Sequence, residues 1–451
     1  MIYQKLAKDV FVPSLDFLRG TKVGRCLKEL EKNQWLKLEE LREIQQKNLK
    51  FLIKHAYENT PYYHRKFKER GLKPDDIKTK EDLAKLPALT KEEFRNNFDD
   101  LVTTSYSRQK MRLYSTGGST GEPLRFYVIK KQRSWETAAM IRGNSWCGYR
   151  LGDKISLIWG SPIDVSETEK FDNKIINFFW RRLFLAASEL SEARMRRYAQ
   201  KLIDFKPKIL RGYSSAVYLL SRFIEHEGLN VSPDAVITTA EMLFDHQRRK
   251  IEEVFGCDVY DSYGSREVEE IASECAEHVG YHISAENVVL EFVKNGEWVA
   301  PGEMGAILVT NLSNYAMPFI RYEIGDLGKQ SDEICPCGRG LPLLKSLEGR
   351  ITDIIVTPDK FISSPILENV FLDLPVKQYQ IIQETEKKIV IKIVKDEGYS
   401  PKDAKSIITK INRYIGHIQI EFRLVDSIPP SESGKRRVVI SDIPIKFASQ
   451  D

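Results

Sequence analysis

The apolar positions of the first hundred residues recur at helical spacing. In EELREIQQKNLKFLIKHAYENT, the apolar side chains that repeat before TPYY ends the run are Leu41, Ile44, Leu49, Leu52, Ile53 and Ala56. Two later stretches, TKEDLAKLP and TKEEFRNNF, each begin with Thr and place an acidic residue close behind it, as helix N-termini do. We therefore predict a helical segment over residues 1–100.

Apolar runs alternate with helical patterns from residue 101 to 349. The runs DKISLIWG, KILRGYSS, DAVITTAE and CDVYDSYG end in small or polar residues, and ARMRRYAQKLIDF and HQRRKIEEVFG lie between them. This alternation predicts an α/β sheet, which binds ligands where its strands pass into loops. The later runs ENVVLEFV, WVAPGEMGAILVTNL and FIRYEIGDLG are typical of antiparallel strands joined by turns.

A second unit follows the stretch LEGRITDII. The segments YQIIQETEKKIVIKIV, DAKSIITKINRYIG and IQIEFRLVD predict a small α+β domain over residues 350–451. A chain of 451 residues is also too long for a single core. The predicted organisation is an N-terminal domain over residues 1–349, helical to about residue 100 and then α/β and β, followed by this C-terminal domain.

The composition is that of an ordinary soluble globular protein, with 42% hydrophobic and 29% charged residues and a formal net charge of +5. The sequence has no dense basic tract with interleaved aromatic residues, so no nucleic-acid partner is expected. Arg194, Arg196 and Arg197 form the densest basic patch, for which the solvated face of a helix is the simpler explanation.

No segment has the pattern of a membrane span or a secretory signal. The stretch MIYQKLAKDVFVPS lacks the apolar core of a signal peptide, and no window approaches the roughly 18 apolar residues of a span. IINFFWRRLFLAAS comes nearest, but Arg181 and Arg182 divide it, which favours a buried amphipathic helix over a membrane-surface helix. Six cysteines in a chain of this size argue against a disulfide scaffold, so we expect a cytoplasmic protein.

The stretch YSTGGSTGEPLRFY gathers small residues in front of an apolar run. Its N–H groups and hydroxyls suit a phosphate, although a surface turn would use the same residue types. A P-loop would need Lys and Ser or Thr after the second glycine, but Glu122 and Pro123 follow here, and there is no GxGxxG. If this loop handles phosphate, its lysine comes from elsewhere. The candidate phosphate-binding residues are Ser115, Thr116, Gly117, Gly118, Ser119, Thr120 and Gly121.

Five separated segments follow the order found in the adenylate-forming superfamily. They are YSTGGSTGEP, TTAE, YDSYGSRE, RYEIGDLG with LEGRITD, and SGKRR. The chain resembles this superfamily, which includes acyl-CoA synthetases, nonribosomal peptide adenylation domains and luciferases. It is most similar to the phenylacetate-CoA ligase branch, and there to capsular-polysaccharide-associated members that share a helical N-terminus with HAYENTPYY. The resemblance implies an α/β fold with a large N-terminal adenylate-forming domain of several subdomains and a small, mobile C-terminal domain.

The resemblance also implies a role for each motif. The loop around Gly118 would wrap the β- and γ-phosphates of ATP. Tyr263 would lie against the adenine ring, and Glu267 would hold Mg²⁺, which needs hard oxygen ligands. Asp326 would accept hydrogen bonds from both ribose hydroxyls, although a turn or a solvated surface would explain such residues singly. The further residues that the resemblance assigns to the nucleotide are Glu241 of TTAE, Gly264, Ser265 and Arg350.

Lys435 of SESGKRR matches the adenylation lysine of the superfamily. It would bridge the carboxylate and the α-phosphate and neutralise the charge that builds as oxygen attacks phosphorus. The alternative is a surface lysine in a basic tail. One position departs from the family pattern, because family hinges carry Asp or Lys two residues after the arginine, where this chain has Thr352 followed by Asp353. Thr352 would then be the pivot of the domain rotation between adenylation and thioester formation.

Two segments, CAEHVGYHISAEN and CPCGRG, combine cysteine and histidine. Cys275, His282, Cys335 and Cys337 would make the Cys₃His set that structural zinc prefers, with His278 as a competitor for the fourth position. Two unrelated loops with reduced thiols are the alternative. The three remaining cysteines have the pattern of isolated small hydrophobic residues: Cys26, Cys147 and Cys257.

Taken together, these resemblances imply an ATP-dependent, AMP-forming ligase that activates a small carboxylic acid and passes the acyl group to a thiol, with coenzyme A as the expected acceptor. The acid would lie near Tyr213 and Ser214. One alternative acceptor is an amine in surface-polysaccharide assembly, and an alternative of another class is a non-catalytic, nucleotide-binding partner. The sequence names neither the acid nor the oligomeric state.

Overall fold

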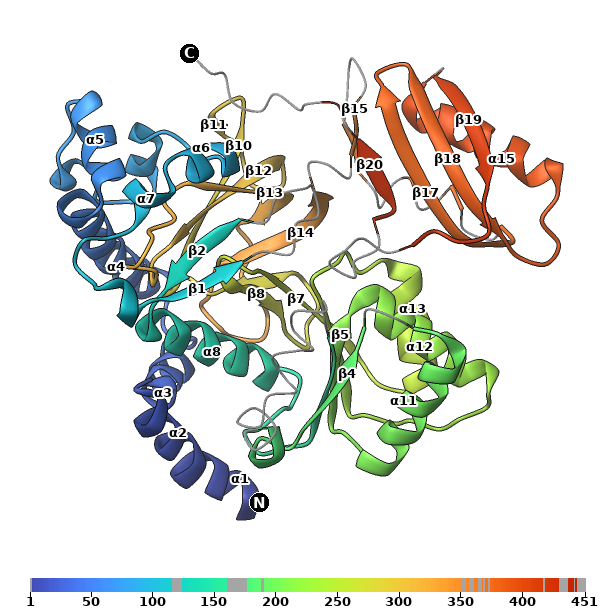
Figure 1. The fold of residues 1–451 in the computed structure, drawn as a ribbon, viewed down its shortest axis with the longest axis horizontal. Helices are drawn as coiled ribbons and strands as arrows, with labels where there is room; N and C mark the ends of the chain where they lie inside the picture. Colours follow the sequence, from blue (N-terminus) through green and yellow to red (C-terminus); the bar gives the residue numbers. More distant parts are fainter. Residues whose placement is uncertain are drawn as a thin grey trace.

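The computed structural model describes residues 2–115, 124–159, 177–187, 190–350, 354–356, 361–363, 367, 370–371, 374–416, 418–429, 437–441 and 443. Helices fill the first hundred residues, as the apolar spacing predicted (Figure 1). The long helix α4 (Leu38–Asn59) half-buries Ile44 and buries Leu41, Leu49, Leu52, Ile53 and Ala56. The other elements of this segment are α1 (Ile2–Leu6), the π-helical turn η1 (Ala7–Phe11), α2 (Val12–Arg19), α3 (Val23–Asn33), α5 (Pro61–Glu69), η2 (Pro74–Asp76), α7 (Phe98–Leu101) and η4 (Arg108–Lys110).

The two predicted helix starts differ in detail. Thr90 caps α6 (Lys91–Asn96), since its side chain accepts the backbone N–H of Glu93 at 3.0 Å. The TKEDLAK stretch forms a short 3-10 helix, η3 (Glu81–Lys85), and there Asp82 accepts the backbone N–H groups of the two residues before Lys80. The acidic residue therefore takes the capping role that the pattern assigned to threonine.

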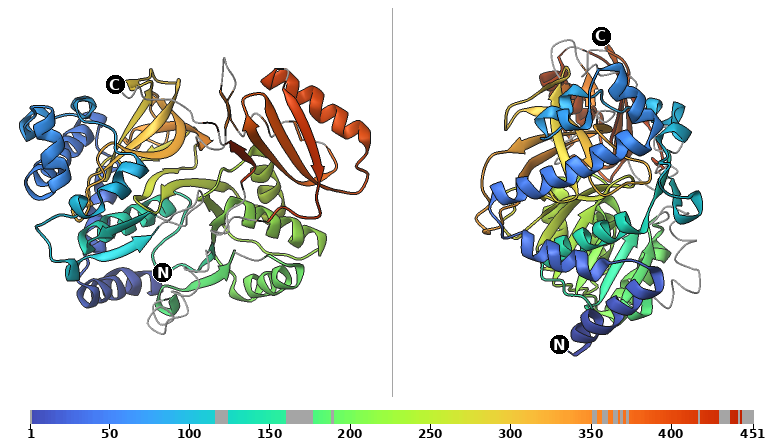
Figure 2. Two further views of the ribbon diagram at one scale, coloured as in Figure 1. Left: turned by 45° about the horizontal axis from the view of Figure 1, so that its top comes forward. Right: turned by 90° about the vertical axis from the view of Figure 1, so that its left-hand side faces the viewer.

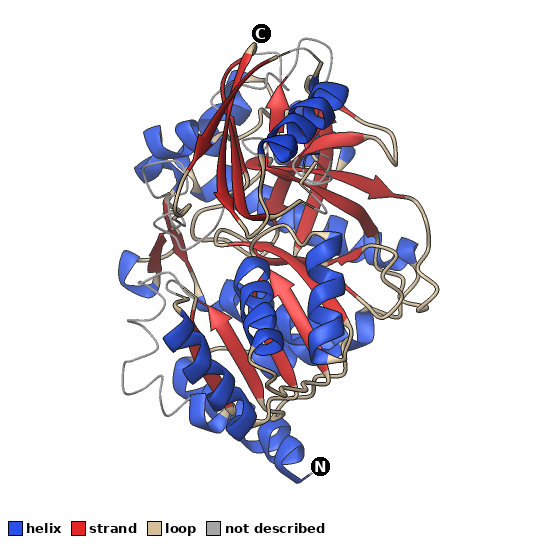
Figure 3. Cartoon of the chain, turned by 90° about the vertical axis from the view of Figure 1, so that its right-hand side faces the viewer, coloured by secondary structure: helices blue, strands red, loops and turns tan. Residues whose placement is uncertain are grey.

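A twelve-stranded sheet forms the centre of the large N-terminal body, in the order β11-β10-β12-β13-β14-β9-β8-β7-β6-β5-β3-β4. The half of the sheet from β7 to β4 is parallel, and its strands β5 and β6 are buried at every position, as strands covered on both faces are. Helices α11, α12 and α13 cover this half (Figures 1 and 3). The elements are β3 (Ile155–Trp159), β4 (Arg182–Ala186), α11 (Glu192–Phe205), β5 (Ile209–Tyr213), α12 (Ser214–His226), β6 (Ala235–Thr239), α13 (Asp245–Phe255) and β7 (Val259–Ser265).

The strand direction changes between β7 and β8, which pair antiparallel, and the rest of the sheet is antiparallel. The predicted change from α/β to antiparallel β is therefore confirmed, and it occurs within one continuous sheet. These strands are β8 (Glu269–Glu274), β9 (Tyr281–Ile283), β10 (Val288–Lys294), β11 (Glu297–Trp298), β12 (Met304–Asn311), β13 (Tyr322–Ser331) and β14 (Leu343–Arg350). A hairpin of β1 (Arg112–Ser115) and β2 (Arg125–Val128) leads into α8 (Lys130–Ser145).

The C-terminal residues build a separate small sheet in the order β19-β18-β17-β20 (Figure 2). One helix, α15 (Pro401–Ile415), packs Ile407, Ile411 and Ile415 into a core with the isoleucines of β17 and β18. The fold is thus mixed α/β with a smaller α+β unit, as predicted. The strands of the four-stranded sheet are β17 (Val376–Thr385), β18 (Lys388–Lys395), β19 (Gln419–Leu424) and β20 (Val439–Ser441). Before them, β15 (Ile354–Val356) and β16 (Phe361–Ser363) pair as a separate two-stranded sheet.

One prediction is wrong over the described part of IINFFWRRLFLAAS. Arg182–Ala186 is the edge strand β4, and Phe178 before it is 76% exposed, so this stretch is not a buried helix. A five-residue apolar run cannot be assigned to a helix or a strand by periodicity alone. Among the described residues, no helix has the length and apolar character needed to cross a membrane.

A buried ion pair fastens α8 to the turn before β10. Arg142 of α8 and Glu286 are both almost fully inaccessible to solvent, and the guanidinium donates to the carboxylate at 2.8 Å. The same guanidinium donates to the carbonyl of Leu30 at 3.4 Å, which connects α3 to the pair. Replacing only one partner of such a pair destabilises the fold, because the remaining charge is then buried without a partner and poorly solvated.

We expect Glu286→Leu to lower the midpoint of thermal unfolding strongly, by the equivalent of about 3–5 kcal/mol, because it leaves Arg142 charged and buried. The double variant Arg142→Met/Glu286→Leu removes both charges at similar volume and should recover most of this loss. The midpoints can be compared by differential scanning calorimetry. A double variant that unfolds at or below the single variant's midpoint would contradict this account.

Candidate active site

The ends of three parallel strands bring three sequence motifs to one edge of the sheet. Tyr213 at the end of β5 is in register with Thr239 at the end of β6, and Thr239 is in register with Ser262 of β7. RGYSS, TTAE and YDSYGSRE therefore lie side by side where strands pass into loops, which is the usual ligand-binding edge of such a sheet. The ring of Tyr213 also lies 5.2 Å from the ring of Trp159 at the end of β3.

Glu241 ties the TTAE loop to the start of α12. Its carboxylate accepts the backbone N–H of Ser215 at 2.9 Å, and its backbone carbonyl accepts the hydroxyl of Ser214 at 3.3 Å. Ala240 before it has a φ of 70°, a left-handed conformation that turns the chain toward this helix. The structure thus brings Glu241, predicted for the adenine pocket, together with Tyr213 and Ser214, predicted for the acid.

Tyr263 and Asp326 meet although 63 residues separate them in sequence. The hydroxyl of Tyr263, on β7, donates to Oδ2 of Asp326, on β13, at 2.9 Å. Tyr263 is buried, and Asp326 is half-buried. The tyrosine predicted to contact adenine and the carboxylate predicted to bind ribose are therefore direct neighbours, joined by this hydrogen bond.

Glu267 is held by a tyrosine that the sequence analysis did not single out. The hydroxyl of Tyr322, at the start of β13, donates to Oε1 of Glu267 at 2.8 Å, and both residues are buried. Burial and the adjacent Glu267 charge raise the pKa of Tyr322 well above its usual value, so this tyrosine stays a hydrogen-bond donor. Tyr322 lies in RYEIGDLG, four residues before Asp326, but a tyrosine in an apolar strand carries no signal of this role.

Gly264 and Ser265 shape the turn between Tyr263 and Glu267. The register of β7 and β8 shifts between Tyr263 and Gly264, and a Cβ at Gly264 would lie 1.8 Å from the carbonyl oxygen of Glu269. Only glycine fits such a close approach of two backbones. Ser265 accepts the backbone N–H of Val268 at 3.3 Å. In this structure Gly264 and Ser265 therefore fix the path of the backbone between Tyr263 and Glu267.

Several other predicted site residues lie outside the residues that the structure describes. Ser115 ends β1 and pairs with Arg125 of β2, which fixes one end of the loop, whereas Thr116–Gly121 lie outside the described residues. Lys435, Thr352 and Asp353 also lie outside them. Arg350 ends β14 with its backbone in register with Asp326.

Arg133 connects the β1–β2 hairpin to the turn that carries Glu267. From α8, it forms an ion pair with Glu269 and lies 3.5 Å from the buried Glu136. Its guanidinium also lies 5.4 Å from the ring centre of Tyr114, the residue before Ser115. Arg133 could not be predicted from the sequence, because one arginine among the charged residues of a helix has no distinguishing pattern.

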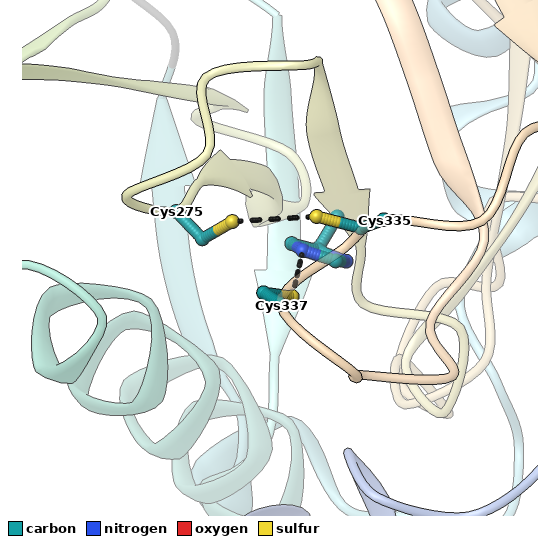
Figure 4. A group of neighbouring side chains, drawn as sticks. Cys275, Cys335 and Cys337 are labelled. Atoms are coloured by element: carbon teal, nitrogen blue, oxygen red, sulfur yellow. Dashed lines mark hydrogen bonds between the residues drawn. The ribbon is translucent and has the colours of Figure 1, made fainter.

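The four predicted zinc ligands come together in the structure (Figure 4). Their ligand atoms all lie within 4.8 Å of one another, with Sγ of Cys275 3.6 Å from Sγ of Cys335 and Sγ of Cys337 3.3 Å from Nε2 of His282. Cys275 follows β8, His282 lies on β9, and the two other cysteines lie between β13 and β14. His278 is not part of the group and lies 3.4 Å from the carboxylate of Glu274.

The histidine of this Cys/His cluster has the charge state that a metal ligand needs. Burial and the nearby charge of Arg339 lower the pKa of His282 to about 4, so its imidazole is neutral at pH 7, as a ligand must be. Burial raises the pKa of Cys275, and it raises that of Cys335 to about 12. Burial also acts to raise the pKa of Cys337, but hydrogen bonds and the charge of Arg339 outweigh it and leave that pKa lowered. A divalent cation would offset the cost of three buried thiolates.

The Cys/His cluster also touches the N-terminal helices. Gly340 donates its backbone N–H to the carbonyl of Gln34 at 3.0 Å, and a Cβ on it would lie 1.9 Å from the carbonyl oxygen of Leu36. Trp146, directly after α8, donates to the side chain of Gln34 at 2.8 Å, and its ring lies 5.2 Å from the ring of His282. The cluster therefore fastens the C-terminal end of α3 to the antiparallel half of the sheet. The other three cysteines are not in disulfides: Cys26 and Cys147 are buried, and Cys257 is half-buried.

Comparisons with known proteins agree with this geometry. Residues 354–442 match the family model described as the CapK C-terminal domain. The chain is 29% identical to a phenylacetate-coenzyme A ligase of Aromatoleum evansii over 341 residues, which is 73% of this chain and 74% of the relative. It is 25% identical to Protein CapK of Staphylococcus aureus over 421 residues, which is 90% of both chains.

Solved structures show the same fold. A 2-hydroxyisobutyryl-CoA ligase, crystallised in the postadenylation state with an acyl-AMP ligand, matches 91% of this chain and 92% of its own with a TM-score of 0.75 at 20% identity. An anthranilate CoA ligase bound to anthranoyl-AMP matches 74% of this chain and 66% of its own with a TM-score of 0.56 at 15% identity. The resemblance inferred from the five motifs is confirmed: the chain has the fold of the adenylate-forming CoA ligases and is related in sequence to the phenylacetate-CoA ligases and to CapK.

Proposed function

We propose that the protein is an ATP-dependent, AMP-forming ligase that activates a carboxylic acid as an acyl-adenylate and transfers the acyl group to the thiol of coenzyme A. The observation that carries this proposal is the meeting of Tyr263, Asp326 and Glu267 where the sheet changes from parallel to antiparallel. An aromatic ring, a diol-binding carboxylate and a metal-binding carboxylate are what a magnesium-bound ATP requires. The relatives named phenylacetate-coenzyme A ligase support the same reaction.

Each half-reaction balances without a further reactant. In the first, a carboxylate oxygen of the acid attacks the α-phosphorus of ATP, and the bond to the bridging oxygen breaks to release pyrophosphate. In the second, the thiol sulfur attacks the acyl carbon, the carbon–oxygen bond to phosphate breaks, AMP leaves, and the thiol proton passes to solvent. The protein therefore has to bind the nucleotide rigidly and neutralise charge at phosphorus.

The described residues perform the binding. The ring of Tyr263 packs on adenine, and its hydroxyl orients Asp326 to accept hydrogen bonds from the ribose hydroxyls. Glu267 would hold Mg²⁺, which would supply positive charge beside the phosphates, and the hydroxyl of Tyr322 keeps that carboxylate in place. The acid lies at the strand end beside Tyr213, where Trp159 supplies a second aromatic wall.

Most of the remaining roles fall on residues outside the described part of the chain. We infer that the loop Ser115–Gly121 binds the β- and γ-phosphates, that Lys435 bridges the acid and the α-phosphate, and that Arg350 touches the nucleotide at the domain junction. Residues 350–451 then form the mobile C-terminal domain, with Thr352 as its pivot.

A second candidate acceptor is an amine in surface-polysaccharide assembly, and the match to CapK favours it. That match spans 90% of both chains, and the C-terminal unit fits the CapK domain model. Both candidates share the adenylation step. Incubation of the protein with ATP, a panel of acids and either coenzyme A or amines separates them by the product that forms.

Lys435→Ala should reduce acid-dependent exchange of pyrophosphate into ATP by roughly 100-fold or more, because the charge at the α-phosphate loses its counter-ion. ATP binding measured by calorimetry should change little. Lys402→Ala, an exposed lysine of the same domain, is the matched control and should exchange like the wild type. Unchanged exchange in Lys435→Ala would refute the assigned role.

Tyr322→Phe should raise the Mg²⁺ concentration needed for half-maximal adenylation by about tenfold, because Glu267 loses the hydroxyl that orients it. The buried Tyr63, whose hydroxyl donates to the carbonyl of Pro318 at 2.8 Å, provides the control Tyr63→Phe, which should leave the Mg²⁺ requirement unaltered. Magnesium titrations of the exchange rate measure both. Equal requirements in the two variants would show that Tyr322 has only a packing role.

We also infer that the Cys/His cluster holds a structural zinc ion. Protein purified without chelator should contain about one zinc per chain by plasma mass spectrometry. Cys335→Ser should lose the metal and unfold at a lower temperature, whereas Cys257→Ser should retain it. The inference fails if the wild-type protein contains no metal and unfolds at the same temperature as Cys335→Ser.

A further inference from the structure

The N-terminal helices expose an unusual number of large apolar side chains. Phe17 is 88% exposed, Leu18 77% and Ile2 82%, and Leu6 and Val10 are also exposed. Ile2, Leu6 and Val10 follow one another at intervals of four, and Phe17 lies seven positions later, so they recur at helical spacing. Apolar surface concentrated in one place on a soluble protein marks an interaction site.

This exposed side belongs to helices that are held in place on their other side. Ala7 and Val12 are buried, the hydroxyl of Tyr3 donates to the carbonyl of Phe179 at 2.8 Å, and the ring of Phe11 lies 5.2 Å from the ring of Phe179. The neighbouring Phe178 is itself 76% exposed and extends the apolar surface. We name this surface the N-terminal apolar patch, which consists of Ile2, Leu6, Val10, Phe17, Leu18 and Phe178.

Basic residues outnumber acidic ones in the segment that carries most of the N-terminal apolar patch, although Lys8 lies 3.9 Å from the carboxylate of Glu31 beyond that segment. Residues 2–28 contain two acidic residues, and one of them, Asp16, faces inward, where it accepts hydrogen bonds from Thr21, Val23 and Gly24. Six basic residues against two acidic ones give this segment a net charge of +4, whereas the whole chain has +5. The exposed basic residues are Lys5, Lys8, Arg19, Lys22, Arg25 and Lys28.

We propose that the N-terminal apolar patch docks the protein on a membrane surface that contains anionic lipids. The apolar side chains enter the boundary between headgroups and acyl chains, and the lysines and arginines bind the headgroup phosphates, as in interfacial amphipathic helices. The helices lie along the surface, so no spanning segment is required.

Charge argues against a second copy of the chain as the occupant. A symmetric dimer through this patch would place the same surface of both copies face to face and bring the two basic rims together. The patch also lies at the end of the molecule remote from the C-terminal sheet (Figures 1 and 3). Docking through it therefore leaves the small domain away from the bilayer.

The test uses the whole chain and vesicles of defined composition, with or without added ATP. Co-sedimentation with phosphatidylcholine vesicles that contain phosphatidylglycerol should exceed that with pure phosphatidylcholine by about tenfold or more. Binding should fall as salt is raised to about 0.5 M, because surface charges are then screened. Wild-type protein that does not bind the anionic vesicles overturns the proposal.

Variants identify the surface. Phe17→Ser/Leu18→Ser and Lys5→Glu/Lys8→Glu should each weaken binding to anionic vesicles by about tenfold, without lowering the midpoint of thermal unfolding, because these side chains are exposed. The control is Phe51→Ser, a 57% exposed phenylalanine on α4, which should bind like the wild type. Undiminished binding by Phe17→Ser/Leu18→Ser refutes the proposal. A wild-type dimer in sedimentation equilibrium that this double variant dissociates would make a second copy the occupant and would also refute it.

Discussion

Two tyrosine–carboxylate hydrogen bonds between the β7 turn and β13 hold the candidate site together. They run in opposite directions: Tyr263 of β7 donates to Asp326 of β13, and Tyr322 of β13 donates to Glu267 after β7. Three strands lie between β7 and β13 in the sheet, so a flat sheet would separate them by about 19 Å. The sheet therefore cannot be flat here, and its curvature brings residues from both halves together.

The sequence pattern predicted the secondary structure and most of the site residues, but it did not predict contacts between residues that are distant in sequence. Apolar spacing predicted the helices of the first hundred residues and the change from parallel to antiparallel strands, since burial on one or two faces leaves different periodicities. Tyr322 and Arg133 were missed because their importance comes from contacts with Glu267 and Glu269 across the fold. The strand at Arg182–Ala186 was taken for part of a helix, because a short apolar run fits both.

The Cys/His cluster and the N-terminal helices extend the same reasoning beyond the site. Four potential ligands from two sequence segments converge beside Gln34, so a metal there would fasten the helical segment to the sheet that carries Asp326. The sequence predicted all four residues of the Cys/His cluster, including His282, and the structure places the competing His278 beside Glu274 instead. The N-terminal apolar patch had no sequence signal, because exposure decides whether apolar residues form a core or a surface.

The most direct test is a crystal structure of the protein with a non-hydrolysable ATP analogue and Mg²⁺. The account predicts adenine against the ring of Tyr263, both ribose hydroxyls on Asp326 and the metal on Glu267. A nucleotide bound elsewhere, with these three residues untouched, would contradict it.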